Sequence, residues 1–493
     1  MDNLLMAHVH LPPFLKPNFD DWSAYELLLL AALTTALIWY LQFSWGQRRL
    51  YKYARNVPGP FAYPLIGSAH HFLGDPYQIF TNITGLYEKY PGIFKVWYGH
   101  RLFYAVSDPK YFEICCRTAC RKNIGTGTRN QWWDMDFLQR PQANILVEQL
   151  TNYAEKGEFD IFHVVSKYSL DTICESTMGV KVNAQTTDSP FPKWVDRIFE
   201  IVFLRIFVFW YHFDFIFNMT MLAKDFSCCI ENMHRYSEHV SQCIKQLVQC
   251  IQSVVREKKI AHEKEMGQLK QKGIQIKKRY DENSQFTEQE LTEEVNTFII
   301  AGSDTTASTS SFALVAMGLH QDLQQKVFEE VIDVIGPDRA VEPADLPHLK
   351  YTERFVKETL RIFPVAGFVV RAVEEDVDIG DHVLPSGSSV IFGILRAHTN
   401  EKYWPDPYKF DPDRFLPEEV AKRHPCTYVP FSYGPRNCIG MKYGMMSIKT
   451  LIATVIRRYR IHTSYKRLED IKLKSNLVLR PKDGYKVSIE VRQ

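Results

Sequence analysis

The sequence predicts a mainly helical protein with small β-sheets, in which one transmembrane helix precedes a single large domain. Three observations lead to this fold class. An apolar run near the start has the length of a membrane span. Several long segments place apolar residues three and four positions apart, whereas segments with the alternation of a strand are short. The 493 residues suffice to bury a large core or to enclose a bulky cofactor.

Residues 25–45 form the apolar run, YELLLLAALTTALIWYLQFSW, which carries one charge, at Glu26. Arg48, Arg49, Lys52 and Arg55 follow it, so the positive-inside rule places everything downstream in the cytosol. A cleaved signal peptide or a buried core helix is the alternative. The run lacks the basic flank and the small-residue cleavage site of a signal peptide, which favours a permanent anchor.

The domain organisation follows from this anchor. The Pro58-Gly59-Pro60 sequence combines two fixed proline angles with a flexible glycine, as expected for a hinge after the membrane helix. We therefore expect a short lumenal tail, the anchor, a basic segment with the hinge, and one cytosolic catalytic domain, over residues 1–24, 25–45, 46–60 and 61–493.

Further segments have a recognisable character. Apolar spacing predicts helices over residues 293–320, 322–335, 351–363 and 438–459, and alternation predicts strands over 389–395 and 486–491. Residues 191–222 are rich in aromatic side chains, which is typical of either a buried core or a lid that touches the membrane. Residues 257–290 are rich in charge and read as a solvated connector.

Composition excludes some classes of partner. Lys plus Arg number 59 and Asp plus Glu 57, a net charge of +2, so nothing indicates a nucleic acid partner. The ten cysteines are scattered without a CxxC pair, which fits reduced thiols better than a disulfide framework.

The strongest chemical signal is the ten-residue sequence FSYGPRNCIG at 431–440, directly ahead of a predicted helix. At a helix N-terminus, Cys438 would be stabilised as a thiolate, a soft metal ligand. Gly434 and Gly440 leave room for a flat cofactor, and Arg436 can bind a carboxylate. A single cysteine is usually a small buried apolar residue, but fixed neighbours at fixed offsets make coincidence improbable here.

This sequence resembles the haem-binding signature of the cytochrome P-450 superfamily, starting with Phe431 and holding the axial ligand at Cys438. The resemblance implies the cytochrome P-450 fold, about a dozen helices with small sheets, and haem b as the cofactor. It also implies that the thiolate promotes O–O cleavage while the protein provides position, protons and a dry pocket.

A second motif, FIIAGSDTT at 298–306, interrupts the apolar pattern of a helix with small and polar residues. Thr305 could donate a hydrogen bond to oxygen and Asp304 could relay protons. A kink in which the threonine bonds back to a carbonyl is equally compatible with the residues alone. The run resembles the oxygen-activating helix of the superfamily, which favours the catalytic interpretation.

A third motif, Glu358-Thr-Leu-Arg361, is weak by itself because ordinary helix ion pairs share its spacing. Together with Arg414 it resembles the superfamily's structural ion-pair network, which holds the loops on the haem side. Residues 364–371 look like the segment that lines the substrate pocket and ends in a propionate-binding arginine, here Arg371. The expected pocket residues are Phe298, Ala301, Val365, Phe368 and Val369.

In detail the chain looks closest to the insect-like family-4 clan, with two departures. Relatives commonly carry a glutamate that bonds covalently to haem where Ala301 stands, so we expect no covalent haem link apart from the bond from Cys438. Relatives also have a Trp-x-x-x-Arg helix after the position of Gly127. Here residues 128–149 contain Trp132 and Trp133 but no arginine four positions later.

Two functions remain. The first is a monooxygenase of the endoplasmic reticulum (microsomal) membrane that inserts one oxygen atom into a lipophilic fatty acid, hormone or xenobiotic. Its electrons would come from NADPH through NADPH-cytochrome P-450 reductase, with cytochrome b5 as a further partner and membrane lipid around the anchor. The second is a haem-poor or inactive membrane protein that keeps the fold, because region 128–149 is altered. We find no HExxH, GxSxG or phosphate-binding loop to support another enzyme class.

Overall fold

The structure is a computed structural model that describes residues 23–118, 139–187, 189–236 and 288–492. The chain divides into two compact units, Met1–Asn56 and Val57–Gln493. In the first unit, helix α1 (Ala24–Gly46) is followed by α2 (Arg48–Ala54). Ser23 and Glu26 form a capping box at the start of α1. Within the described residues, α1 is the one helix long and apolar enough to cross a membrane.

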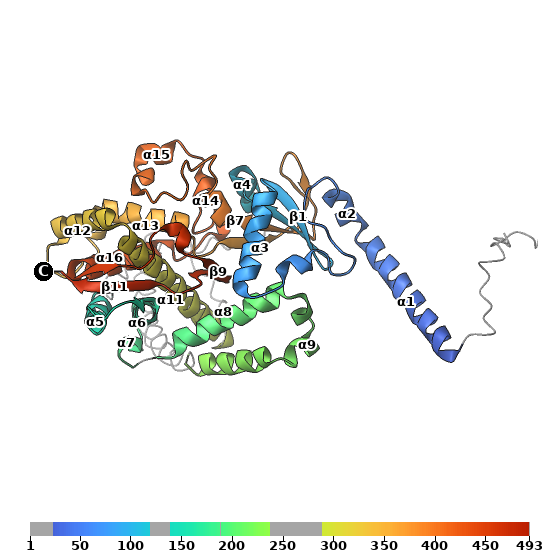
Figure 1. The fold of residues 1–493 in the computed structure, drawn as a ribbon, viewed down its shortest axis with the longest axis horizontal. Coiled ribbons are helices and arrows are strands. Elements are labelled where there is room, and N and C mark those ends of the chain that lie inside the picture. Colours follow the sequence, from blue (N-terminus) through green and yellow to red (C-terminus); the bar gives the residue numbers. More distant parts are fainter. Residues whose placement is uncertain (1–22, 119–138, 188, 237–287, 493) are drawn as a thin grey trace, which may run out of the picture. The chain divides into compact units, whose positions relative to one another are not determined.

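The second unit is built around α11 (Glu288–Leu319), which contacts α6 (Phe162–Met178), α16 (Met441–Arg458) and α13 (Lys350–Ile362) (Figure 1). Residues 306–317 of α11 are all buried. Many of them are small and the others are apolar, which allows the neighbouring helices to pack closely on α11. The other helices of this bundle are α5 (Gln139–Thr151), α7 (Ala184–Thr187) and α12 (Gln321–Ile335).

The largest sheet has the strand order β1-β2-β7-β4. Strands β1 and β2 form an antiparallel hairpin, β2 pairs with β7 in parallel, and β7 pairs with β4 in antiparallel orientation. Smaller sheets join β3, β11 and β8, β9 with β10, and β5 with β6. The bounds are β1 Ile93–Tyr98, β2 Arg101–Val106, β3 Phe159–Asp160, β4 Phe368–Ala372, β5 Val377–Asp378, β6 Val383–Leu384, β7 Ser389–Gly393, β8 Tyr459–His462, β9 Leu473–Asn476, β10 Val478–Pro481 and β11 Lys486–Val491.

Further helices lie around the sheets and the bundle. They are α3 (Pro76–Lys89), α4 (Pro109–Thr118), α8 (Phe191–Phe207), α9 (Asp214–Asn218), α14 (Ile394–His398) and α15 (Pro417–Ala421). Within the aromatic region 191–222, α8 packs on β9 and α6, whereas side chains of the following segment are exposed at Trp210, Phe213, Phe215, Met219 and Met221. The region is therefore buried in its first half and open to solvent in its second.

Most predicted elements are confirmed within a few residues. The helix predicted over 293–320 is α11, the one over 438–459 is α16, and the strand over 486–491 is β11. The predicted strand over 389–395 is two residues too long, because α14 begins at Ile394. The second half of region 128–149 forms α5, while residues 128–138, with Trp132 and Trp133, lie outside the described residues, as does nearly all of 257–290.

Candidate functional site

The cysteine loop is closed by a backbone hydrogen bond in which the Cys438 N–H donates to the Phe431 carbonyl, at 2.8 Å. Between these residues, Ser432 and Gly434 take positive φ values of 63° and 80°. A side chain on Gly434 would bring its Cβ to 3.0 Å from the Cys116 carbonyl oxygen in α4. The loop therefore requires glycine there, both for its backbone angle and for its close contact with α4.

Cys438 lies three residues before α16, with Gly440 as the N-cap. Its side chain is exposed, and Phe431, Gly434 and Gly440 around it are half-buried. Neighbouring atoms nevertheless desolvate the sulfur, and this raises the pKa of the Cys438 thiol, while a hydrogen bond from the Gly440 backbone lowers it. The sequence predicted a stabilised thiolate, and the Gly440 backbone contributes in that direction. Metal coordination deprotonates such a thiol directly.

A buried ion-pair network holds the loops in front of the cysteine. The Arg361 Nε lies 2.7 Å from Glu358 Oε2, and both side chains are fully buried. The guanidinium of Arg361 also donates to the His398 and Pro407 carbonyls, at 3.0 and 2.6 Å. Arg414 lies 3.6 Å from Glu358 and donates to the Asp406 carbonyl. The three predicted network residues thus meet, and together they tie the segment 398–414 to α13.

One face of α11 is exposed directly before the buried stretch 306–317. Phe298, Ala301 and Thr305 are exposed on it, at the spacing of one helix face. The Thr305 hydroxyl donates to the Ala301 carbonyl at 2.7 Å, the back-bonded state that the sequence left open. Gly302 faces α6, where an added Cβ would lie 2.8 Å from Ile173 Cδ1. This glycine therefore allows α11 to pack closely on α6.

Asp304 points to the other side of α11, where it is buried. Its Oδ1 accepts a hydrogen bond from Arg480 Nη2 at 2.6 Å, and its Oδ2 has no hydrogen-bond partner among the described residues. Burial raises the pKa of the Asp304 carboxyl, and the Arg480 charge opposes that rise. Asp304 and Thr305 are therefore adjacent in sequence but occupy different surroundings.

Arg371 connects the edge strand β4 to the cysteine loop. Its guanidinium donates to the Val370 carbonyl at 2.9 Å and contacts Ser432 Oγ at 3.4 Å. Its Nε is buried and has no hydrogen-bond partner within the described part of the chain. A buried, unused N–H next to the cysteine loop fits a carboxylate group such as a haem propionate. Arg436, the other arginine predicted for this role, is exposed.

Strand alternation separates the predicted pocket residues of β4. Val369 shares a face with Arg371, whereas Phe368 lies on the opposite face. The Phe368 ring packs on Phe80 and Tyr87 of α3. Val365 precedes the strand, is buried, and accepts a hydrogen bond from the Leu479 N–H at 2.8 Å.

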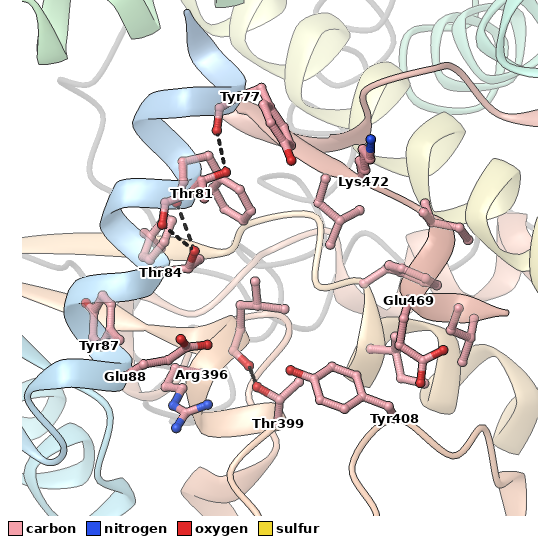
Figure 2. Close-up of a pocket in the computed structure, with 18 residues that line it drawn as sticks. Tyr77, Thr81, Thr84, Tyr87, Glu88, Arg396, Thr399, Tyr408, Glu469 and Lys472 are labelled. Atoms are coloured by element: carbon pink, nitrogen blue, oxygen red, sulfur yellow. Dashed lines mark hydrogen bonds between the residues drawn. The ribbon is translucent and has the colours of Figure 1, made fainter. Parts of the chain in front are cut away.

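Phe368 lines a separate cavity of about 400 Å³ between α3, α14 and the segment 468–473. Figure 2 shows Tyr77, Thr81 and Thr84 of α3 on one side of it and Glu469 and Lys472 on the other. Five residues were predicted to line the substrate pocket: Phe298, Ala301, Val365, Phe368 and Val369. Of these, Phe368 alone lines this cavity.

A second cysteine also lies near possible metal ligands. Glu113, His424 and the buried Cys426 place their ligand atoms within 4.8 Å of one another. The two ring nitrogens of His424 already have contacts, since Nδ1 accepts from the Cys426 N–H and Nε2 lies 3.1 Å from Glu113. Cys426 is thus the natural comparison for Cys438 in any test of thiolate ligation.

Comparison with known proteins decides the family. The sequence model of the family described as Cytochrome P450 matches residues 135–489, most of the chain. The chain belongs to the cytochrome P450 family. Cytochrome P450 4c3 of Drosophila melanogaster is 30% identical, with 95% of this chain and 96% of that protein covered. Cytochrome P450 4c21 of Blattella germanica and Cytochrome P450 4V2 of Homo sapiens are each 29% identical, with 96% of this chain covered and 100% and 96% of those proteins.

As a cytochrome P450 the protein is a monooxygenase that binds haem through a cysteine thiolate, and its apolar N-terminal helix fits a membrane anchor. The family match starts at residue 135, inside the region 128–149. Arg480, which holds Asp304, is the residue that sequence reasoning missed. Nothing in its local sequence marks it, because its partners lie more than 170 positions away.

Proposed function

We propose that the protein is a haem-thiolate monooxygenase that hydroxylates a lipophilic substrate, with Cys438 as the iron ligand. The observation that carries the proposal is the closed loop 431–438, which presents an accessible sulfur directly before α16. Phe431, Gly434 and Gly440 give the loop its shape. When bound, haem supplies the activation of O2, of which one atom goes to the substrate and the other leaves as water, with two electrons from NADPH.

The arginines next to the loop have a binding role in this proposal. Arg371 would bind a propionate through its unused Nε, and the exposed Arg436 would bind another. Ala301 offers no carboxylate, so haem b would be held without a bond to α11. Glu358, Arg361 and Arg414 act only by keeping the loops in place.

The residues of α11 provide the polar chemistry. Asp304 would exchange a proton at Oδ2, since its Oδ1 is held by Arg480. The Thr305 hydroxyl would exchange its bond to the Ala301 carbonyl for one to oxygen. Phe298, Ala301, Val365 and Val369 would line the substrate pocket, whereas Phe368 joins it only if the pocket extends to the α3 side of the sheet.

The finer assignments complete the proposal. The substrate is a fatty acid, hormone or xenobiotic, because Phe298 and Ala301, which are exposed on one face of α11, are apolar. The redox partners are NADPH-cytochrome P-450 reductase and cytochrome b5. The anchor at 25–45 holds the protein in the endoplasmic reticulum membrane, with residues 1–24 lumenal and the domain at 61–493 cytosolic, joined by residues 46–60.

Turnover under oxygen-18 gas tests the proposal directly. The full-length protein, its reductase and NADPH are incubated with a panel of fatty acids, hormones and plant toxins, and products are identified by mass. We expect one labelled oxygen atom in a product and NADPH consumption that matches its amount. Substoichiometric haem together with the absence of any labelled product would instead support the inactive alternative based on region 128–149.

A further inference from the structure

Arg480 lies between two acidic residues that belong to different helices. It stands on β10 and is buried. Its Nη2 lies 2.6 Å from Asp304 Oδ1 of α11, and its Nε lies 3.0 Å from Asp196 Oδ1 of α8. The guanidinium also packs 4.1 Å above the ring of Phe162. One positive charge therefore serves two carboxylates, and a flat ring fixes its plane.

The two carboxylates depend on this charge to different degrees. The Asp304 side chain is only 3% exposed, so it has little water to stabilise its ionised form. The Asp196 side chain is 44% exposed and is partly stabilised by solvent. Arg480 therefore favours the ionised form of Asp304, whereas Asp196 shares the same guanidinium and disfavours that form by repulsion.

Asp196 also links the shared charge to the position of α8. It lies in the first half of α8, which contacts β9 and α11. The β9-β10 hairpin carries Arg480 itself. Any shift of α8 against this hairpin changes the distance from Asp196 to Arg480, and with it the charge that remains for Asp304.

We propose that Arg480 is a positioning residue that couples α8 to the proton-handling acid of α11. It holds Oδ1 of Asp304, leaves Oδ2 for proton exchange, and divides its charge between Asp304 and Asp196. A substrate that displaces α8 therefore alters the readiness of Asp304 to take up a proton. The inference rests on the proposed function of Asp304, but the distribution of charge is measurable without turnover.

The other groups that face Asp304 do not titrate in the relevant range. Tyr485 packs on Phe162, and burial raises the pKa of its hydroxyl far above neutrality. Ser308, on the next turn of α11, lies 3.5 Å from Arg480 Nη1 and is uncharged. Among the described residues, Asp196, Arg480 and Tyr485 are the titratable groups that interact with this carboxyl.

The protonation of Asp304 can be followed by the infrared C=O band of a buried carboxylic acid in the full-length, haem-loaded protein, assigned by its loss in D304N. We expect R480M to raise the midpoint of this band by about one to three pH units, because the stabilising positive charge is lost. We expect D196N to lower the midpoint, because a competing negative charge is removed. In R480K the lysine can form one ion pair, but it cannot contact both carboxylates as the guanidinium does. The midpoint of R480K should therefore lie between those of wild type and R480M.

The coupling is tested by combining the changes and by a matched control. The shift caused by D196N should shrink at least twofold in the R480M background, and hydrogen exchange of α8 should speed up in R480M and D196N. R492M is the control, since Arg492 lies 4.0 Å over Phe328 and contacts Gln324 instead. Equal D196N shifts with and without Arg480, or R492M acting like R480M, would overturn the proposal, whether or not the protein turns over a substrate.

Discussion

His398 is fully buried where α14 ends, and its Nε2 accepts a hydrogen bond from the Val429 N–H at 2.8 Å. Burial and the nearby Arg361 charge lower the pKa of His398 to about 3. In the unfolded chain the imidazole gains a proton near pH 6.5, whereas the folded protein resists it. Its contribution to stability is therefore present above pH 6.5 and is lost as the pH falls toward 3.

The lowered pKa of His398 predicts that the free energy of unfolding falls in acid because of this one residue. As the pH falls from 6.5 to 4, protonation of His398 in the unfolded chain should lower the free energy of unfolding by about 1.4 kcal/mol per pH unit. H398Q keeps an acceptor for the Val429 N–H without the titrating group, so its unfolding free energy should fall less steeply. Denaturant unfolding at several pH values measures both slopes, and equal slopes would contradict the prediction.

Gly434 gives a second prediction at the scale of one residue. G434A combines a positive φ with a contact at 3.0 Å to the Cys116 carbonyl, so we expect a loss of about 1–3 kcal/mol in stability and reduced haem content. G444A is the control, because a Cβ there meets nothing within 4 Å and alanine favours a helix. Thermal unfolding and haem absorbance compare them, and equal behaviour would refute the role of Gly434.

Local sequence predicted those residues whose chemistry lies within a short motif. The cysteine loop and the Glu358–Arg361 pair were recognisable because their members are a few positions apart. Arg480 was not, because its ion pairs join β10 to α8 and α11. The orientation of Phe368 could not be predicted from its motif either, since it depends on which face of β4 packs on α3.

At the scale of elements, the packing of α11 on α6 depends on Gly302. G302A alone should destabilise the protein by about 1–3 kcal/mol, because its Cβ would lie 2.8 Å from Ile173 Cδ1. I173A removes the atoms that obstruct it, so the double variant should lose less stability than the sum of the single variants. A double-mutant cycle from denaturant unfolding measures this coupling, and strict additivity would show that the contact does not constrain the helices.

Element boundaries were predictable where apolar periodicity was strong and less so where the chain turns sharply. The helices 322–335 and 351–363 match α12 and α13 within one residue, because apolar residues recur at helical spacing along both. The strand at 389–395 was overextended, since Ile394 and Leu395 continue the apolar pattern but begin α14. Periodicity alone does not distinguish a strand from a helix that starts directly after it.

For the whole molecule, we predict from the exposed apolar side chains in residues 208–221 a second membrane contact besides the anchor. Phe215 is 69% and Met219 is 81% exposed, and burying each such side chain contributes about 1.5–3 kcal/mol. A chain without residues 1–56 should still bind phospholipid vesicles, and F215S with M219S should weaken that binding at least tenfold. V420S, at an exposed site on α15, is the control in vesicle sedimentation. Equal binding by all variants would exclude this contact.

The assignment of Cys438 as the haem ligand is tested most directly by the absorption spectrum of the reduced, carbon-monoxide-bound protein. The full-length wild type and C426A should both show the red-shifted band of thiolate-ligated haem, and C438A should lose it. A band that survives in C438A but disappears in C426A would move the ligand to the cluster of Glu113, His424 and Cys426. A wild-type protein without the band would contradict a haem-thiolate monooxygenase altogether.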